Sequence, residues 1–304
     1  MTSQHREALS GLIYSVCEHP GLTVLIGEAG TGKTTLLYVL RSWLDSQRFV
    51  SALCTNPVLT REELFDLLLQ QFDVPCSSAL KNRQLVALQE RLIQYRTEGR
   101  SAILLVDEAQ RLPFDLLEEL RLLLNVETPR EKLLEIILIG QPELSDILRR
   151  PELRQLKQRV SCMCKLEPLI LEEVREYIAH RLTLAGLPNQ TLFPEETIPA
   201  IFRCTKGIPR LVNSICDSAL QTGFGLRSPQ ITSSIILEAA RDLDLSPDDL
   251  TGHPASNGKV HLAAAAAGAE AGASRHSYAV PSILEDYATR QKSLGFLSKL
   301  IVGR

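Results

Sequence analysis

The sequence lacks the features that would place a protein across a membrane or outside the cell. It has no uncharged apolar run that approaches the roughly 20 residues of a membrane-spanning helix. Its first residues do not form the basic and then apolar pattern of a signal peptide. The seven cysteines are scattered without a paired CxxC spacing, which favours buried, reduced thiols over a metal site or disulfides. These absences predict a cytoplasmic protein.

An excess of charge of either sign is also absent. The net charge is −3 at pH 7, and charged residues make up 23% of the chain, which is close to the average. The composition therefore gives no whole-protein signal for nucleic acid or an anionic membrane, although a local basic face is compatible with it. The 304 residues suffice for one large domain or two ordinary ones with buried cores.

One stretch carries the strongest chemical signal. Residues 27–34 match G-x-x-x-x-G-K-[ST] at every fixed position and lie between an apolar strand at 22–26 and a helix that holds Lys33 and Thr34 in its first turn. Glycines let backbone N–H groups approach a phosphate, and the helix N-terminus adds partial positive charge. We therefore expect a phosphate loop rather than a chance glycine-rich turn, with Lys33 on the β- and γ-phosphates and Thr34 on Mg²⁺. The residues expected to contact ATP here are Gly27, Glu28, Ala29, Gly30, Thr31, Gly32, Lys33, Thr34 and Thr35.

The second informative stretch is 102–108, an apolar run that ends in Asp107 and Glu108. A continuous apolar strand indicates burial on both faces, as in a parallel sheet, and ligands collect at the carboxyl ends of such strands. With a phosphate loop upstream, Asp107 is predicted to bind Mg²⁺ together with Thr34, and Glu108 to orient and activate the attacking water. The alternative is an acidic strand-to-loop transition without a catalytic role.

Two further polar residues are candidates for contact with the nucleotide phosphates or the attacking water. Gln141 ends the strand predicted at 135–140, where it can contact the γ-phosphate or the water; the alternative is a turn residue before Pro142. Arg210 lies in the first turn of a predicted helix, where the helix dipole favours an acid. This mismatch indicates that Arg210 serves a ligand phosphate.

Strands alternate with helices as far as residue 167. The sequence therefore predicts an α/β fold, a doubly wound parallel five-stranded sheet with helices on both faces, over residues 1–167. The five predicted strands are 22–26, 49–54, 102–108, 135–140 and 160–166.

Only helices are expected after that, in a small all-α lid domain at 168–245 that closes over the nucleotide base. A flexible linker rich in Ala, Gly and Pro is predicted at 246–276, and an amphipathic helix at 277–304. That last helix either docks on its own domain or serves as a tether or partner-binding helix.

Three local predictions concern the first domain. Thr60 and Glu63 form a capping-box pattern at the start of a helix. A helix at about 80–98 places Leu85, Leu88, Leu92 and Ile93 inward. A basic helix is expected at 149–159, before the last strand.

These motifs in this order resemble an AAA+ ATPase, a class of P-loop NTPase. More closely, they resemble the ATPase domain of the general secretion pathway protein A (ExeA/GspA) family, over about residues 5–240. More distantly, they are similar to transposition regulators of the TniB/TnsC/MuB kind. The segments that carry the resemblance, besides the phosphate loop, are 5–9, 107–110, 118–121, 140–144, 149–159 and 207–213.

The resemblance implies roles that the motifs leave open. Gln141 would be the sensor-1 residue, where AAA+ proteins more broadly often have Asn or Thr, and Arg210 the sensor-2 arginine. An arginine finger that completes the neighbouring subunit's site would be Arg159, with Arg154 as the alternative. Such a finger implies head-to-tail assembly of the chain with itself, as a ring or filament, and it supplies positive charge to a γ-phosphoryl transition state. The implied catalytic residues are Lys33, Glu108, Gln141, Arg154, Arg159 and Arg210.

The resemblance thus implies a Mg²⁺-dependent ATPase, with ATP and Mg²⁺ as cofactors, that drives or regulates a membrane-associated secretion, pilus or exopolysaccharide export system. It would be cytoplasmic, with contact to the inner membrane through partners. Full-length secretion members continue into a membrane span and a peptidoglycan-binding domain, which this sequence does not contain, so direct insertion of a pore is not expected.

An alternative is an ATP-switched platform that binds DNA. A basic pore-facing surface that included Arg83, Arg91, Arg149 or Arg150, together with salt-dependent DNA binding, would favour it. A third possibility, a nucleotide-binding scaffold with negligible turnover, is disfavoured by the intact Glu108.

Overall fold

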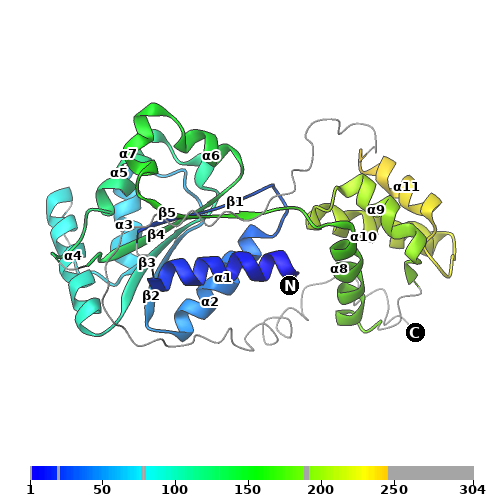
Figure 1. Ribbon diagram of the computed structural model, residues 1–304, viewed down its shortest axis with the longest axis horizontal. Coiled ribbons are helices and arrows are strands. Elements are labelled where there is room, and N and C mark those ends of the chain that lie inside the picture. Colours follow the sequence, from blue (N-terminus) through cyan, green and yellow to red (C-terminus); the bar gives the residue numbers. More distant parts are fainter. Residues whose placement is uncertain are drawn as a thin grey trace, which may run out of the picture.

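The structure, a computed structural model, describes residues 2–18, 21–76, 78, 80–129, 131–187 and 192–245. The linker predicted at 246–276 and the helix predicted at 277–304 lie outside these residues. A sheet flanked by helices forms one part of the molecule, and a group of helices forms the other (Figure 1). None of the described helices is long and apolar enough to cross a membrane.

The sheet has five parallel strands in the order β2-β3-β4-β1-β5. Every residue of β1 and β4 is buried, as expected for strands that are covered on both faces. The prediction of a doubly wound parallel five-stranded sheet is confirmed. The strands are β1 (Leu22–Gly27), β2 (Phe49–Cys54), β3 (Ser101–Val106), β4 (Leu134–Gly140) and β5 (Val160–Leu166).

Helices cover both faces of this sheet (Figure 1). Successive strand residues point to opposite faces, so Val24 and Leu104 belong to one apolar cluster and Leu25 and Leu105 to another. The first cluster is covered mainly by α3, α4 and α5, and the second by α1 and α2. The elements are α1 (Ser3–Glu18), α2 (Lys33–Ser46), α3 (Arg61–Gln71), α4 (Lys81–Thr97), η1 (Ala109–Arg111), α5 (Phe114–Leu123), α6 (Glu143–Leu148), η2 (Pro151–Leu153) and α7 (Arg154–Lys157).

Two local predictions about helices α3 and α4 have different outcomes. The capping box is present: the Thr60 hydroxyl accepts from the Glu63 backbone N–H, and the Glu63 carboxylate accepts from that of Thr60. The inward placement of Ile93 is wrong, because this side chain is 38% exposed while Leu88 and Leu92 are buried. Ile93 follows Leu92 by about 100° around the helix, which carries it past the edge of the buried stripe.

The predicted continuous helix at 149–159 is wrong as well. Helix α6 ends at Leu148, Pro151 begins the short 3-10 helix η2, and α7 starts at Arg154. Proline has no N–H to donate and disfavours the helical conformation in the residue before it. Accordingly, Arg150 has φ −59° and ψ 141°, outside the helical region, which breaks the helix.

The second part of the molecule contains helices and no strand among its described residues, and it has its own apolar cluster, which shares no residue with the two clusters of the sheet. The predicted domain boundary between residues 167 and 168 remains a prediction that this separation supports. The helices of this part, the lid, are α8 (Leu171–Leu184), η4 (Glu195–Thr197), α9 (Ile198–Thr205), α10 (Pro209–Gly225) and α11 (Ser233–Asp242).

A backbone hydrogen bond connects the segment that leads into the lid with the turn before α10. The Leu169 N–H donates a 2.9 Å hydrogen bond to the Gly207 carbonyl oxygen. Gly207 has φ +76°, and a Cβ on it would lie 1.8 Å from the Leu169 carbonyl oxygen. No side chain fits at this position, so the contact requires glycine.

Candidate functional site

The predicted phosphate loop runs from the end of β1 to the first turn of α2, and two other segments lie against it. Gly30 has φ +84°, and a Cβ on it would come within 2.7 Å of the Arg210 Cβ in the lid. Gly32 has φ +102°, and a Cβ there would come within 2.8 Å of His5 Nε2 in α1. The glycines therefore provide the loop conformation and also the space in which the lid and α1 reach the loop.

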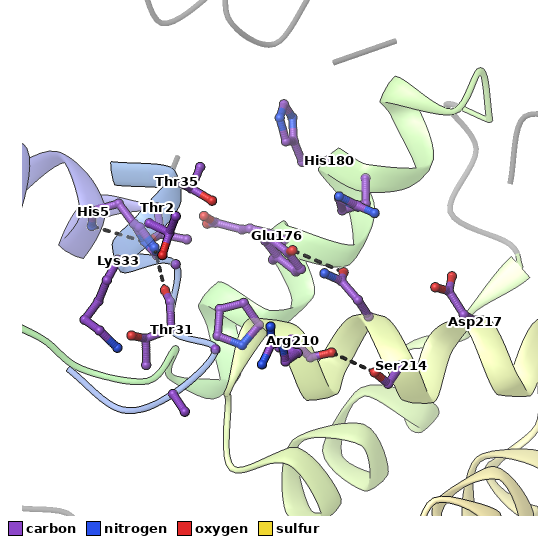
Figure 2. Close-up of a pocket in the computed structure, with 18 of the residues that line it drawn as sticks. Thr2, His5, Thr31, Lys33, Thr35, Glu176, His180, Arg210, Ser214 and Asp217 are labelled. Atoms are coloured by element: carbon purple, nitrogen blue, oxygen red, sulfur yellow. Dashed lines mark hydrogen bonds between the residues drawn. The ribbon is translucent and has the colours of Figure 1, made fainter. Parts of the chain in front are cut away.

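Lys33 is buried and lies folded against its own loop (Figure 2). Its ammonium group donates hydrogen bonds of 2.8 Å to the Gly27 carbonyl oxygen and 2.9 Å to that of Glu28. Burial lowers the pKa of Lys33, and the nearby Glu108 and Asp107 carboxylates partly offset this effect. The lysine thus occupies two backbone acceptors, which it must exchange for phosphate oxygens when a nucleotide binds.

Asp107 is held from two sides at the end of β3. Its Oδ2 accepts a 3.0 Å hydrogen bond from the Thr34 hydroxyl, and its Oδ1 accepts one of 2.9 Å from the Glu108 backbone N–H. Such hard oxygen ligands suit Mg²⁺, which keeps several waters and binds phosphate oxygens. The described residues hold no group of three or more His, Cys, Asp or Glu side chains that could bind a metal alone, and Mg²⁺ beside a phosphate needs none.

Glu108 has a left-handed backbone conformation, φ 51° and ψ 36°, which is uncommon for a residue other than glycine. Its Oε2 accepts hydrogen bonds from the side-chain amides of Gln110, at 2.6 Å, and Gln141, at 3.4 Å. Gln110 also accepts a 3.1 Å hydrogen bond from the Gln141 backbone N–H. The structure thus brings the predicted Glu108 and Gln141 together, and it adds Gln110, which sequence reasoning had not selected as a site residue.

A cavity of about 890 Å³ opens between the phosphate loop and the lid (Figure 2). Arg210 lines this cavity; its backbone N–H donates to the Gly30 carbonyl oxygen at 3.2 Å, while its guanidinium makes no hydrogen bond or ion pair with any described residue. Sequence reasoning missed the other lid residues, although their i, i+3 and i, i+4 spacing along α8 and α10 places them on one face of each helix. They include Tyr177, His180, Arg181, Asn213 and Asp217.

The first turn of α1 connects the phosphate loop with the lid. His5 Nε2 lies 2.9 Å from the Thr31 carbonyl oxygen, and His5 Nδ1 lies 2.8 Å from the Thr2 hydroxyl. Burial lowers the pKa of His5. Ser3 donates a 2.6 Å hydrogen bond to the Glu173 carboxylate on α8. In the sequence, His5 stood out only as part of the family-like segment 5–9, because nothing local reveals that α1 folds back onto the loop.

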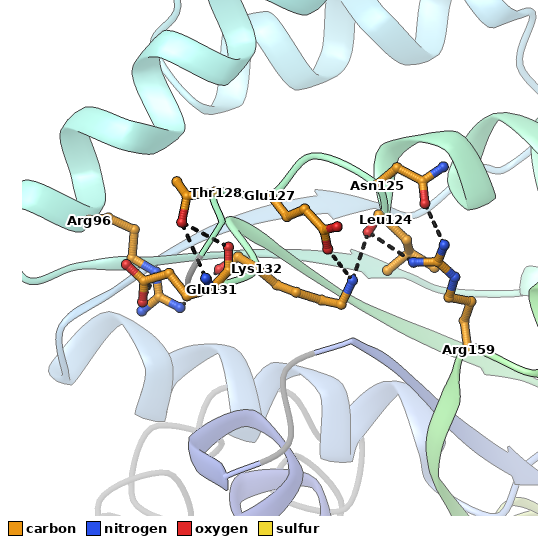
Figure 3. Close-up of polar contacts among 8 residues, drawn as sticks. All are labelled: Arg96, Leu124, Asn125, Glu127, Thr128, Glu131, Lys132 and Arg159. Atoms are coloured by element: carbon orange, nitrogen blue, oxygen red, sulfur yellow. Dashed lines mark hydrogen bonds and ion pairs between the residues drawn. The ribbon is translucent and has the colours of Figure 1, made fainter.

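The two candidate finger residues do not line this cavity. Arg159 precedes β5, at the sheet edge opposite the phosphate loop, and its guanidinium donates to Asn125 Oδ1 at 2.5 Å and to the Leu124 carbonyl oxygen at 3.5 Å (Figure 3). Arg154 on α7 is exposed and makes no hydrogen bond or ion pair within the part of the chain that the structure describes. Arg159 is therefore held by contacts within its own chain, whereas Arg154 has no such contact with the described residues.

Comparison with known proteins identifies the domain that this site belongs to. Residues 17–148 match the family model described as an AAA domain. Over 252 residues, the chain is 38% identical to general secretion pathway protein A of Aeromonas hydrophila. The match covers 83% of this chain and 46% of that relative, so the chain spans about half of the relative's length.

Solved structures share the fold at low sequence identity. Cdc6p of Pyrobaculum aerophilum superposes with a TM-score of 0.58 and 17% identity, over 80% of this chain and 68% of that one. The RuvB branch migration motor of Thermotoga maritima gives 0.55 and 17%, over 82% and 72%. The ORC2 protein of Aeropyrum pernix gives 0.55 and 14%, over 80% and 68%. At these identities the likeness is one of fold. Residues 17–148 thus match an AAA domain, and the chain is similar, over the region that it spans, to general secretion pathway protein A.

Proposed function

We propose that this ATPase works with Mg²⁺ and drives or regulates a membrane-associated secretion or export system. The observation that carries this proposal is the 38% identity to general secretion pathway protein A, which extends over 83% of this chain. The 252 matched residues are more than the AAA match at 17–148 spans, so the similarity extends beyond that domain. The export partner and the contact with the inner membrane through that partner belong to the proposal.

The site geometry supports a division of roles around the nucleotide. The loop from Gly27 to Thr35 would enclose the phosphates, with Lys33 released from its two carbonyl acceptors to neutralise them. Thr34 and Asp107 would hold Mg²⁺, which when bound neutralises charge on the β- and γ-phosphate oxygens. Arg210 would add positive charge from the lid as the lid domain closes over the base.

Glu108 would orient and activate the attacking water, with Gln141 beside it. Both hydrogen bonds to the Glu108 carboxylate go to Oε2, and no described residue donates to Oε1. Oε1 is therefore available to accept a proton from water. The γ-phosphoryl group leaves the ADP oxygen as the water oxygen bonds to phosphorus, and one water proton goes to the carboxylate.

Assembly of the chain with itself, head to tail in a ring or filament, would complete each site with an arginine from the neighbour. Arg159 is held by Asn125 and Leu124 of its own chain and must leave these partners to act as a finger. Arg154 is exposed and already free to do so. The charge that such a residue supplies accelerates phosphoryl transfer by orders of magnitude.

The DNA-platform alternative receives less support from the surface. Of the four arginines considered for a basic face, Arg91 pairs with Asp73 and Arg149 pairs with Asp146, so part of their charge is neutralised locally.

Measurement of the ATPase rate against protein concentration, with and without double-stranded DNA at physiological salt, separates the two functions. A specific activity that rises with concentration and ignores DNA supports the secretion ATPase. A rate that stays low until DNA is added supports the platform and contradicts our proposal.

The partner is tested by sedimentation with inner-membrane vesicles from cells that carry a secretion system, with ATP or without nucleotide. We expect nucleotide-dependent recruitment, and Lys33→Ala serves as the matched control that cannot respond to ATP. Equal recruitment by vesicles that lack the secretion system would contradict a role with that system.

A further inference from the structure

Gln110 connects two segments that end at the nucleotide site. It lies in η1, two residues after Glu108, and its side-chain amide spans the distance to the end of β4. On one side it donates to Glu108 Oε2 at 2.6 Å, and on the other it accepts from the Gln141 backbone N–H at 3.1 Å. A carboxylate and a strand end far apart in the sequence are thereby joined by one side chain.

The orientation of this amide follows from its partners. The Gln141 backbone N–H can only donate, so it requires the oxygen of the Gln110 amide. The NH₂ group must then face Glu108, whose ionised carboxylate can only accept. Because each partner accepts a single orientation, Gln110 offers Glu108 a donor and never an acceptor.

Gly140 provides the space that this arrangement needs. A Cβ on Gly140 would lie 2.9 Å from Gln110 Oε1 and 2.9 Å from Leu144 Cδ2. Contacts of that length do not occur without a shift of one of the atoms, so any larger residue at the end of β4 would displace the amide. The backbone of β4 is thus shaped to accept Gln110 beside Gln141.

The hydrogen bond from Gln110 also helps to hold the backbone of Glu108 in an uncommon conformation. The Glu108 backbone adopts the left-handed region, a strained conformation that persists only where surrounding contacts hold it. Gln110 binds Oε2 at 2.6 Å, whereas Gln141 binds the same oxygen at 3.4 Å, so Gln110 makes the shorter contact. Its hold on Oε2 leaves Oε1 facing no described donor, which is the oxygen that a water can use.

We propose that Gln110 is a positioning residue for ATP hydrolysis: it fixes Oε2 of Glu108 against the end of β4, so that Oε1 is presented to the attacking water. The inference rests on the role proposed above for Glu108. It gives the Gln110 side chain a function in turnover and none in nucleotide binding, since Gln110 does not line the cavity.

The test compares Gln110→Ala and Gln110→Glu with wild type and with Gln89→Ala, an exposed glutamine on α4 outside the cavity. We expect both Gln110 variants to lose kcat by about 10- to 100-fold, the effect of one hydrogen bond to a charged group. The affinity for a fluorescent ATP analogue and the melting temperature should stay at the wild-type values. Unchanged or increased kcat in the Gln110→Glu variant, which keeps the side-chain shape, would overturn the proposal.

The pH dependence of kcat separates positioning from a structural role. A carboxyl introduced by Gln110→Glu can donate to Glu108 only while it is protonated, so residual activity should rise as the pH falls. Loss of activity with the wild-type pH profile would instead indicate a structural role and overturn the proposal.

A combined variant distinguishes failure of this inference from failure of the Glu108 role. Adding Gln110→Ala to Glu108→Gln should cause no further loss of kcat, because the two residues act as a unit. A further loss of the size seen for Gln110→Ala alone would overturn the positioning role. If Glu108→Gln alone turned over ATP at the wild-type rate, the role of Glu108 itself would be wrong.

Discussion

The Thr34 hydroxyl donates a 3.0 Å hydrogen bond to the Asp107 carboxylate, although 73 positions separate the two residues. Thr34 lies in the first turn of α2, after β1, and Asp107 follows β3, while β4 lies between these two strands in the sheet. The contact therefore reaches across the carboxyl end of β4, where Gln141 begins the next loop. The order of the strands thus brings the start of α2, the end of β3 and the end of β4 next to one another.

Removal of one partner of this contact should weaken the proposed Mg²⁺ site. We expect Thr34→Ala to raise the Mg²⁺ concentration needed for half-maximal ATPase activity by about tenfold, because one oxygen ligand is lost. Thr34→Ser keeps the hydroxyl and is the matched control. The measurement is a Mg²⁺ titration at saturating ATP, and identical curves for Thr34→Ala and wild type would contradict the assignment.

Lys33→Ala should abolish ATP binding. The variant loses the ammonium group that neutralises the β- and γ-phosphates and leaves the carbonyls of Gly27 and Glu28 facing the site. Equilibrium binding of a fluorescent ATP analogue measures the effect, with Lys157→Ala, an exposed lysine on α7, as the control. Wild-type affinity in Lys33→Ala would remove the phosphate-loop assignment.

Glu108→Gln should bind ATP normally and hydrolyse it very slowly, since an amide cannot take a proton from water at neutral pH. We expect a loss of kcat of about 100-fold or more. Rapid quenching and separation of the bound nucleotide would then show intact ATP in the variant and ADP in wild type. Recovery of ADP at the wild-type rate would exclude Glu108 as the group that activates water.

Mixing experiments should identify the arginine that acts across the subunit interface. Variants Arg154→Ala and Arg159→Ala are each mixed with Lys33→Ala, which keeps both arginines but should not bind ATP, and the ATPase rate is followed. A finger variant should regain activity in the mixture, because its intact nucleotide site receives the arginine of a neighbouring Lys33→Ala subunit. A residue that acts only within its own chain, as the Arg159 contact with Asn125 allows, should give no activity in the mixture.

The pH dependence of stability should reveal Glu135 in β4. This carboxyl is 7% exposed, and burial raises its pKa to about 8, against the smaller opposing effect of Arg96. Between the unfolded value of 4.5 and about 8, the folded chain holds a proton that the unfolded chain has lost, so the free energy of unfolding falls as the pH rises. Glu135→Gln should remove up to about 1.4 kcal/mol per pH unit of this slope.

Denaturant unfolding across this pH range measures the effect. Glu131→Gln, which changes a more exposed partner of the same arginine, is the control and should keep the wild-type slope. Equal slopes in Glu135→Gln and wild type would show that the carboxyl is ionised in the folded protein.

The position of the proposed nucleotide site could be predicted because its residues are consecutive in the sequence. The loop from Gly27 to Thr34 and the pair Asp107 and Glu108 each follow an apolar strand, and parallel strands bring their carboxyl ends to one edge. Arg210 drew attention for a different reason, since its position in the first turn of a helix conflicts with the helix dipole, and the structure places it beside the phosphate loop. In each case a local rule pointed to the site.

The remaining features depend on contacts between distant segments. His5 reaches Thr31 because α1 packs back along the sheet. No local sequence pattern predicts the direction in which α1 packs. Gln110 became visible only when the end of β4 appeared beside it. The helix break at Pro151 was available in the sequence, and the basic run around it led to a wrong continuous helix.

The contact between Leu169 and Gly207 has a mechanical consequence. Helix α10 starts two residues after Gly207 and has 17 residues, so it extends about 25 Å from this point. A rotation of about 10° there would carry its far end through about 4 Å, while Arg210, close to the pivot, would stay near the phosphate loop. Phe224, 72% exposed at that far end, would travel furthest. In such a rotation, Arg210 would stay beside the phosphate loop while the far end of α10 carried an apolar side chain through the solvent.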